Sequence, residues 1–341
     1  MAEITVIITA YNLEKYIGKC FDELYHQSFQ DYDIVVVDDC SRDNTKKIIE
    51  QWKARFSTKL KTLFLEDNLG LPALTRNAAL DSGLIDGKYI LFLDGDDSIE
   101  SDMLEKLYHA IIKYDADVAI CAYDRVETGT GRVLCREMQG FPSVVELPPK
   151  DDILAFVNTS PWNKLWKREL FEDGRFPPFK VGEEVALLYT RYSKCRRIAF
   201  VDDILIHYKV HEGSVISTTQ QETIFQFAEE LKNCYYKQKG EYRDCMGLIV
   251  FLHIGISMVF RAADNRDIDL REHLKWTRKY FCEEFSWFQD NPYLKIRSLI
   301  RHGIKGFVVW CALWTYRVNM FRMVICVYHF ASKKLHIDFK F

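Results

Sequence analysis

The 341-residue chain lacks the sequence patterns of several common cofactor and nucleotide sites. Its ten cysteines form no CxxC pair and no Cys/His set at metal-ligand spacing, which argues against a zinc site or a disulfide framework. We expect the cysteines to be free thiols in a reducing cytosol. No GxxxxGK loop and no GxGxxG follows the first predicted strand, so a standard ATPase or dinucleotide site is excluded. The start, MAEITVIITAYN, lacks the basic residues and long apolar core of a signal peptide, and we expect a cytoplasmic protein.

Acidic residues are almost missing from the tail, residues 291–341, which holds nine Lys or Arg and one Asp. The rest of the chain has a net charge near −11 and the tail one near +8. Its longest uncharged run, 306–316, is eleven residues, short of the ~20 that span a bilayer. Arg297, Arg301 and Lys305 recur every four residues and predict one basic helical face. We expect an amphipathic helix in the membrane interface, with a helix packed on the protein as the alternative and no nucleic-acid partner.

Strand and helix patterns alternate along the first part of the chain, which predicts an α/β unit with a mainly parallel sheet. After residue 220 the pattern changes to helices with short connections. We therefore expect two domains, 1–220 and 221–341. The predicted strands are 4–12, 32–41, 60–68, 88–94 and 116–126, and the predicted helices are 13–29, 41–56, 71–83 and 102–115, followed by further helices around 222–240, 245–263 and 270–285.

Three carboxylates, Asp94, Asp96 and Asp97, directly follow the predicted strand at 88–94. At an effective dielectric constant of about 20, two like charges ~4 Å apart repel by about 4 kcal/mol, so a positive partner is expected. Magnesium commonly takes one or two carboxylates together with substrate phosphates, which suits this cluster. Polar residues end the other strands too, and ligands of parallel sheets bind at those carboxyl ends. The glycine at 95 would let the backbone approach a ligand.

Seven motifs occur in an order and spacing that resembles family 2 glycosyltransferases with the GT-A fold. The resemblance covers about 210 residues and leaves roughly the last 120 uncovered. The motifs are TAYN (9–12), VVVDDCSRDNT (35–45), NLGLPALTRNAAL (68–80), FLDGDD (92–97), WNKLWKRELF (162–171), VGEEVALLY (181–189) and YKVHEGSVIS (208–217).

The resemblance implies a nucleotide-diphosphate site at the carboxyl ends of the first strands. Asp96 matches the direct metal ligand of the DxD motif, for Mn²⁺ or Mg²⁺, and Asp94 lies closer to the ribose or the metal's waters. For Asp97 two interpretations are open: it assists the metal ligands, or it caps the helix that follows. The residues implied in nucleotide binding are Thr9, Tyr11, Asp39, Asn68, Arg76 and Asp94.

The resemblance also implies the groups that act on the acceptor and close the site. The family pattern at 183–184 is usually Glu-Asp, with the second acid as base, whereas this sequence has Glu183 and Glu184. We favour Glu184, although its extra methylene displaces the carboxylate and leaves a larger role for Glu183 open. Helix N-terminal acids are also favoured by the helix dipole alone. The residues expected to face the donor diphosphate or the acceptor are Asn163, Lys164, Lys209, His211 and Ser214.

Together these patterns predict a metal-dependent inverting glycosyltransferase that uses a nucleotide sugar, such as a UDP-sugar, and a saccharide or lipid-linked acceptor. The product would be a bacterial surface polysaccharide, made at the inner face of the membrane. A homo-oligomer is compatible with the sequence. The alternatives are a sugar nucleotidylyltransferase, which would want a Gly-rich loop where TAYN stands, and a receiver-like signalling module that binds metal without nucleotide.

Overall fold

The computed structural model describes residues 2–148, 152–210, 220–285 and 291–325. The chain folds into two units. Unit 1 comprises Met1–Leu147 and Asn158–Ser214, and unit 2 comprises Pro148–Val157 and Val215–Phe341. The predicted boundary at 220 thus differs from the observed one by a few residues. The sequence also carried no sign that a segment near 150 belongs with the helices.

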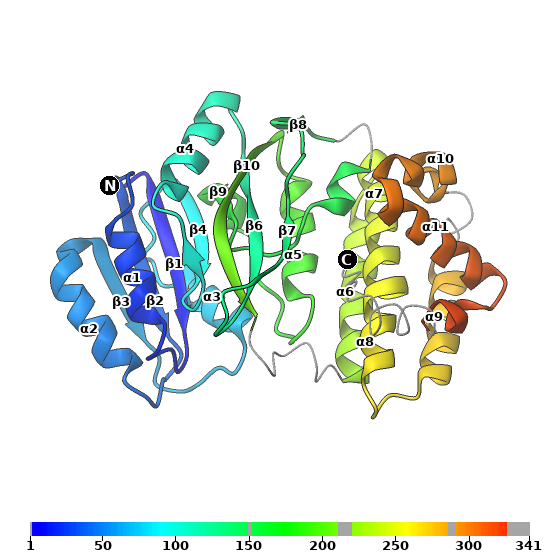
Figure 1. Ribbon diagram of the computed structural model, residues 1–341, viewed down its shortest axis with the longest axis horizontal. Coiled ribbons are helices and arrows are strands. Elements are labelled where there is room, and N and C mark those ends of the chain that lie inside the picture. The colour runs from blue at the N-terminus through cyan, green and yellow to red at the C-terminus, as the bar shows by residue number, and fades with distance from the viewer. Residues whose placement is uncertain (1, 149–151, 211–219, 286–290, 326–341) are drawn as a thin grey trace. The chain divides into compact units, whose positions relative to one another are not determined.

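Unit 1 is built around a ten-stranded sheet whose first half is parallel (Figure 1). Its strands are β1 (Ile4–Ala10), β2 (Tyr32–Asp38), β3 (Leu60–Phe64), β4 (Tyr89–Asp94), β5 (Ser98–Ile99), β6 (Val118–Glu127), β7 (Val133–Glu137), β8 (Val144–Glu146), β9 (Lys164–Lys167) and β10 (Arg197–Val210). The order is β3-β2-β1-β4-β9-β6-β10-β5, with β7 on β6 and β8 on β10. Neighbours among β1 to β4 are parallel, as are β6 and β10, whereas β9 runs antiparallel between β4 and β6. The predicted α/β class is confirmed, but the short antiparallel strands were not predicted.

Apolar, β-branched runs place the first strands in the core, and helices cover the sheet. The helices of unit 1 are α1 (Ile17–Tyr25), α2 (Thr45–Phe56), α3 (Pro72–Asp81), α4 (Met103–Tyr114) and α5 (Glu183–Tyr192). α1 packs against α2, and α3 packs against β1 and β2. Phe92 of β4 contacts Phe171 and Phe176, with ring centroids 5.3 and 5.4 Å away, which closes the core on the α5 side.

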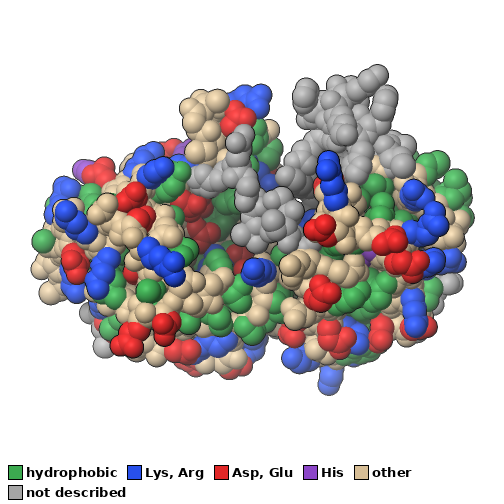
Figure 2. Space-filling view, turned by 90° about the horizontal axis from the view of Figure 1, so that it is seen from below, with side chains coloured by type: hydrophobic (Ala, Val, Ile, Leu, Met, Phe, Trp, Pro, Cys, Tyr) green, Lys and Arg blue, Asp and Glu red, His purple; other side chains and the backbone are tan. Residues whose placement is uncertain are grey.

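The register of the parallel strands brings their polar ends together. Thr9 of β1 lies opposite Asp94 of β4, and Ala10 lies opposite Asp38 of β2. Figure 2 views the molecule from the side on which these strands end in Figure 1, and acidic side chains lie in a hollow of that face. At Gly95, a Cβ atom would come within 2.9 Å of the Leu13 and Ile17 side chains. Its small size therefore serves packing beneath the site.

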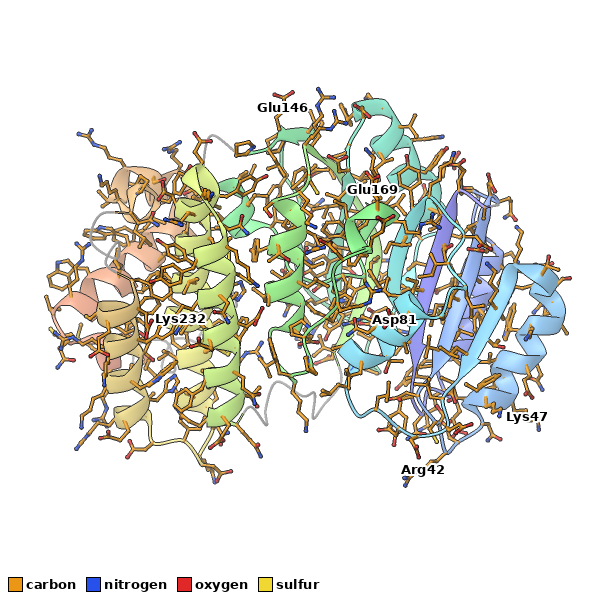
Figure 3. The ribbon with its side chains drawn as sticks, turned by 180° about the vertical axis from the view of Figure 1, so that it is seen from behind. Arg42, Lys47, Asp81, Glu146, Glu169 and Lys232 are labelled. Carbon is orange, nitrogen blue, oxygen red and sulfur yellow. The ribbon has the colours of Figure 1, made fainter. Side chains whose placement is uncertain are left out.

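Unit 2 is helical in the residues that the structure describes. Its helices are α6 (Gln221–Lys237), α7 (Gly240–Val250), the π-helical η5 (Phe251–Ser257), α8 (Met258–Asp264), α9 (Leu270–Glu284), α10 (Ile296–Leu299) and α11 (Gly303–Arg317), with short 3₁₀ turns between some of them. Lys232 of α6, labelled in Figure 3, pairs with Glu229 at 2.7 Å and with Glu284 at 3.4 Å. Gly240–Asp264 is apolar and long enough to cross a membrane, but 78% of its most apolar window is buried inside the protein, as in a core helix.

The basic face predicted for the tail does not form as a single helix. α10 ends at Leu299, a 3₁₀ turn (Ile300–His302) follows, and α11 begins at Gly303 with a positive φ of 61°. That left-handed glycine redirects the chain, so Arg297 and Arg301 do not continue onto α11. The face of α11 that contains Val309 is buried, so the helix packs within its own unit and does not lie free. Residues 333–340, with the last three lysines, lie outside the described residues.

Candidate functional site

The loops after β1, β2 and β3 hold one end of the candidate site. Asp39 is 5% exposed, and its carboxylate accepts the Leu69 amide N–H at 2.7 Å and the Asn68 side-chain amide at 3.2 Å. Asn68 also donates to the Asp39 carbonyl oxygen at 2.8 Å, so the two loops are tied together. Tyr11 is 44% exposed and Thr9 is partly exposed at the end of β1. An exposed aromatic ring near a fixed carboxylate is suited to a nucleotide base.

Arg76, near the middle of α3, connects the two groups of acids. Its Nη2 donates to Asp94 Oδ1 and its Nη1 donates to Glu184 Oε1, both at 2.9 Å. Glu183 Oε1 lies 4.0 Å from Nη1. The Arg76 side chain is 3% exposed and its cation lies over the Phe176 ring at 5.5 Å. Arg76 was predicted near the nucleotide, and the structure places it as a buried counter-charge shared between Asp94 and the start of α5.

Glu183 and Glu184 form the first turn of α5. Gly182 precedes them with φ of 82°, a left-handed conformation that glycine adopts without strain. The Glu184 side chain is 25% exposed and that of Glu183 is 11% exposed. Burial raises the pKa of both carboxyls, and the Arg76 charge opposes the rise. The raised pKa is common to both carboxyls, so only the greater exposure of the Glu184 side chain distinguishes the two residues here.

Lys209 makes two hydrogen bonds to the DGDD loop after β4. Its Nζ donates to the Asp96 carbonyl oxygen at 2.7 Å, and its backbone N–H donates to Asp97 Oδ1 at 3.1 Å. Asp97 is 3% exposed and its Oδ2 is buried without a hydrogen-bond partner. Burial, followed by the charges of Asp94 and Asp96, raises the pKa of the Asp97 carboxyl well above its usual range. Asp97 does not cap the next helix, since Asp102 stands at the N-cap of α4.

A divalent cation fits this loop only together with other oxygen ligands. In the described ranges, no group of three or more His, Cys, Asp or Glu side chains is arranged to hold a metal ion. Asp94 and Asp96 can supply two carboxylates, and magnesium usually completes its shell with water and substrate phosphates. Asp97 is a third carboxyl group in this loop, and its raised pKa favours the neutral form, which leaves Asp94 and Asp96 as the charged ligands. The donor set therefore suits a metal–diphosphate pair better than a bare ion.

Asn163 and Lys164 do not present polar atoms to the solvent. Both side chains are fully buried on or beside β9. Asn163 Nδ2 donates to the Cys121 carbonyl oxygen at 2.8 Å, and Lys164 Nζ donates to Asn158, Ser160 and Asn163 oxygens at 2.6–2.7 Å. Burial lowers the pKa of Lys164 to about 7. Both side chains are thus used in hydrogen bonds inside the protein. His211 and Ser214 lie outside the described residues.

An aromatic stack beside the carboxylates was missed by the sequence reasoning. The Tyr208 ring stacks on Trp162 with centroids 5.3 Å apart and an interplanar angle of 6°. Tyr123 meets the other ring of the stack, Trp162, edge-on at 4.7 Å. Burial, then the charges of Asp97 and Asp94, raises the pKa of Tyr208 to about 12. The sequence feature that could have indicated this stack is Tyr208, immediately before Lys209. A single aromatic residue in a strand is, however, usually interpreted as a core residue until its neighbours are known.

The sequence profile described as Glycosyl transferase family 2 matches residues 5–169. A putative teichuronic acid biosynthesis glycosyltransferase of Bacillus subtilis, TuaG, is 36% identical over 215 residues, which cover 63% of this chain and 81% of that protein. Glycosyltransferase GlyA of Streptococcus pneumoniae is 32% identical over 223 residues, which cover 62% of this chain but only 31% of that protein. The chain thus spans about a third of GlyA's length.

Among solved structures, TarS 1-349 of Staphylococcus aureus in complex with UDP-GlcNAc superposes with a TM-score of 0.70. The match covers 100% of this chain and 94% of that one, at 24% identity. At this identity the likeness concerns the fold. It confirms the predicted GT-A-type sheet followed by a helical region, and extends beyond the segment that the sequence motifs covered.

Proposed function

The chain belongs to glycosyltransferase family 2, and from this premise we propose that it transfers a sugar, with inversion, from a nucleoside diphosphate donor to a saccharide of a bacterial surface polymer. Family membership excludes the nucleotidylyltransferase and receiver-like alternatives. The observation that carries the proposal is the Arg76 bridge, because it sets Asp94 and Glu184 on either side of one guanidinium. A donor-side acid and an acceptor-side acid are thereby held within one buried network.

The donor is proposed to be a UDP-sugar. The solved structures of TarS with UDP and with UDP-GlcNAc support this class of donor. In this chain Asp39 would accept an imide N–H of the base, beside the exposed Tyr11 ring. Asp96 and Asp94 would hold Mn²⁺ or Mg²⁺, which when bound stabilises the charge that develops on the leaving diphosphate. Lys209, near the end of β10, bonds to this loop through its side chain and adds a positive charge there.

On the acceptor side, Glu184 would remove the proton of the attacking hydroxyl as it bonds to the anomeric carbon. Arg76 holds that carboxylate in place through the bond to its Oε1. The partly exposed Tyr208 ring, held by its stack on the buried Trp162, would be the aromatic surface against which an acceptor sugar packs. The base comes from α5 and the DxD acids from the loop after β4. Deprotonation of the acceptor hydroxyl and departure of the nucleoside diphosphate would therefore involve different segments of the chain, as inversion requires.

The acceptor is proposed to be a glycan of the cell envelope, free or lipid-linked. TuaG is named for teichuronic acid biosynthesis, and two further relatives are named as transferases that act on poly(ribitol-phosphate). We place the protein in the cytoplasm, bound peripherally to the inner face of the membrane through its basic C-terminal part, and the monomer and homo-oligomer both fit this role.

Calorimetric titration with UDP, with and without Mn²⁺, tests the proposal. We expect binding that depends on the metal and that is weakened in Asp96→Asn. Asp102→Asn is the matched control, since Asp102 stands at the start of α4 away from the DxD pair, and it should bind like the wild type. If neither UDP nor another nucleoside diphosphate binds in a metal-dependent way, the proposed activity is wrong.

A further inference from the structure

Unit 2 contains a cavity that the catalytic proposal does not use. Its volume is about 290 Å³, and it lies between α9 and the end of α11, which are neighbours in Figure 1. The lining residues are Arg271, Leu274, Lys275, Arg278, Tyr316, Asn319, Phe321 and Arg322. Half of them are cationic and none is acidic. We call this cavity the basic pocket.

The cations of the basic pocket come from two segments. Arg271, Lys275 and Arg278 follow one another at helical spacing and share a face of α9, while Arg322 comes from beyond α11. Lys275 is paired with Glu272 at 2.7 Å. Among the described residues, no carboxylate pairs with any of the three arginine side chains. Several guanidinium groups around one hollow are suited to a phosphate, which they can bind through two N–H groups each.

Two packed aromatic side chains form the floor of the basic pocket. Tyr316 and Phe321 stack with ring centroids 4.1 Å apart, and both are nearly buried. The Tyr316 hydroxyl donates to the Gly255 carbonyl oxygen at 2.6 Å, within the π-helical turn η5. Asn319 at the rim has a positive φ of 59°, which turns the chain sharply after α11. The hollow is therefore shaped by packed groups as well as by surface side chains.

Exposed apolar side chains, which we call the apolar rim, occur on the same stretch of chain that supplies the α11 side of the basic pocket. Trp314, Val318, Met320 and Met323 are 49%, 42%, 44% and 51% exposed, within the segment that supplies Tyr316 to Arg322. A water-soluble polyanion would gain nothing from such a rim. A membrane surface would, because tryptophan and aliphatic side chains insert among lipids while arginines meet the headgroups.

We propose that the basic pocket binds the phosphate headgroup of an anionic phospholipid, with the apolar rim inserted in the membrane interface. The inference deepens the membrane association proposed above and does not depend on the transfer reaction. It assigns the contact to α9 and residues 314–323, whereas the sequence predicted it for the whole tail, 291–341, with a basic face at Arg297, Arg301 and Lys305. It also commits to a lipid in preference to the phosphodiesters of an acceptor polymer.

Binding of the full-length protein to vesicles of phosphatidylcholine, with and without phosphatidylglycerol, tests this inference. The double variant Arg271→Gln/Arg278→Gln should weaken binding to the anionic vesicles on the order of 30-fold, at about fivefold per cation. The control Arg266→Gln/Lys279→Gln removes the same charge from exposed positions outside the cavity. Its binding to the anionic vesicles should be weakened much less. Equal losses for the two pairs would mean that only net charge matters and would overturn the site.

Two further measurements separate the lipid from other occupants. Trp314→Ser/Met320→Ser leaves the charge unchanged and should also weaken vesicle binding, so unchanged binding contradicts insertion of the rim. Soluble poly(glycerol phosphate) should bind far more weakly than vesicles of equal phosphate content. If it binds tightly and the arginine pair abolishes that binding, the pocket serves an acceptor polymer and the lipid proposal is wrong. UDP titration of the same variants reports independently on the donor site and should not change.

Discussion

At the scale of single residues, the Arg76 guanidinium gives the acids of both sides of the site one counter-charge. It bonds to Asp94 and to Glu184 at 2.9 Å and is almost fully buried. A buried ion network is costly to break, because removing one partner leaves the others uncompensated. The protonation of the proposed base is therefore coupled to a residue on the donor side.

Glu184→Gln should lower kcat by about 10²–10⁴-fold, because the amide cannot accept the hydroxyl proton. UDP binding should persist, since the amide oxygen can still accept from Arg76. Steady-state kinetics with a saccharide acceptor and calorimetry with UDP measure the two effects. Glu183→Gln is the matched control and should lose less. An inactive Glu183→Gln beside an active Glu184→Gln would move the base to Glu183.

Arg76→Gln should shift the pH profile of kcat/KM to higher pH. A base acts only when ionised, so kcat/KM falls about tenfold per pH unit below the pKa. Burial already raises the pKa of Glu184, and Arg76 opposes that rise, so its loss raises the pKa further. Arg175→Gln removes an arginine from the exposed pair with Asp81, labelled in Figure 3, and should leave the profile in place. Equal shifts would contradict the role of Arg76.

Motif matching put the right residue types near the site but could not supply the contacts. Arg76 and Glu184 are 108 positions apart and meet only because the fold brings their side chains within hydrogen-bond distance. Asn163 and Lys164 were expected to face the donor diphosphate or the acceptor, because the sequence does not record that both side chains are buried at the start of β9. Only the neighbours in three dimensions distinguish a buried lysine with three oxygen acceptors from a ligand-binding one.

At the scale of elements, apolar β-branched runs and turn residues were enough to predict β1 to β4, β6 and the helices between them. The two- and three-residue strands β5 and β8 carry too few residues for a periodic signal, and β7, β9 and the 14-residue β10 were not predicted either. The break at Gly303 was missed because a glycine within a helical pattern does not reveal its φ. The 3₁₀ segment at Ile153–Phe156 belongs to unit 2 through non-local contacts that periodicity does not record.

Asp152→Asn should destabilise unit 2 by about 1–3 kcal/mol. The Asp152 carboxylate is 3% exposed, and it bonds to His302 Nε2 at 2.9 Å and accepts from Ser298 at 3.1 Å. Replacing one oxygen by an amide nitrogen loses one of these bonds inside the core. Thermal unfolding followed by circular dichroism measures the change. Glu146→Gln, an exposed acid labelled in Figure 3, should change it little.

At the scale of the whole molecule, charge is distributed unevenly along the chain. Residues 291–341 carry nine Lys or Arg and one acid, against an acidic remainder. Composition predicted an anionic surface as the partner of this part, and the fold adds that α9, outside the tail, contributes arginines to the same region. This contribution could not be predicted from the composition of the tail alone.

Association with anionic vesicles should fall steeply as salt is raised, because exposed charges are screened over about 8 Å at physiological ionic strength. Flotation at increasing sodium chloride, with phosphatidylcholine vesicles as the reference, measures it. Binding that is insensitive to salt would show that apolar insertion dominates. Cutting the chain after residue 290 is a poor test, since it removes α11 and with it the buried Val309 and Leu313.

The path of the chain between its units limits how the protein can be divided. The polypeptide enters unit 2 at Pro148, returns at Asn158, and enters it again after Ser214. A catalytic fragment ending near 214 would carry Asp152 and Leu154 as an orphaned insert, and a separate helical fragment would lack the residues that fill its own interior. The two units are therefore not interchangeable modules. Hybrids with related transferases would have to exchange the short internal segment together with the C-terminal helices.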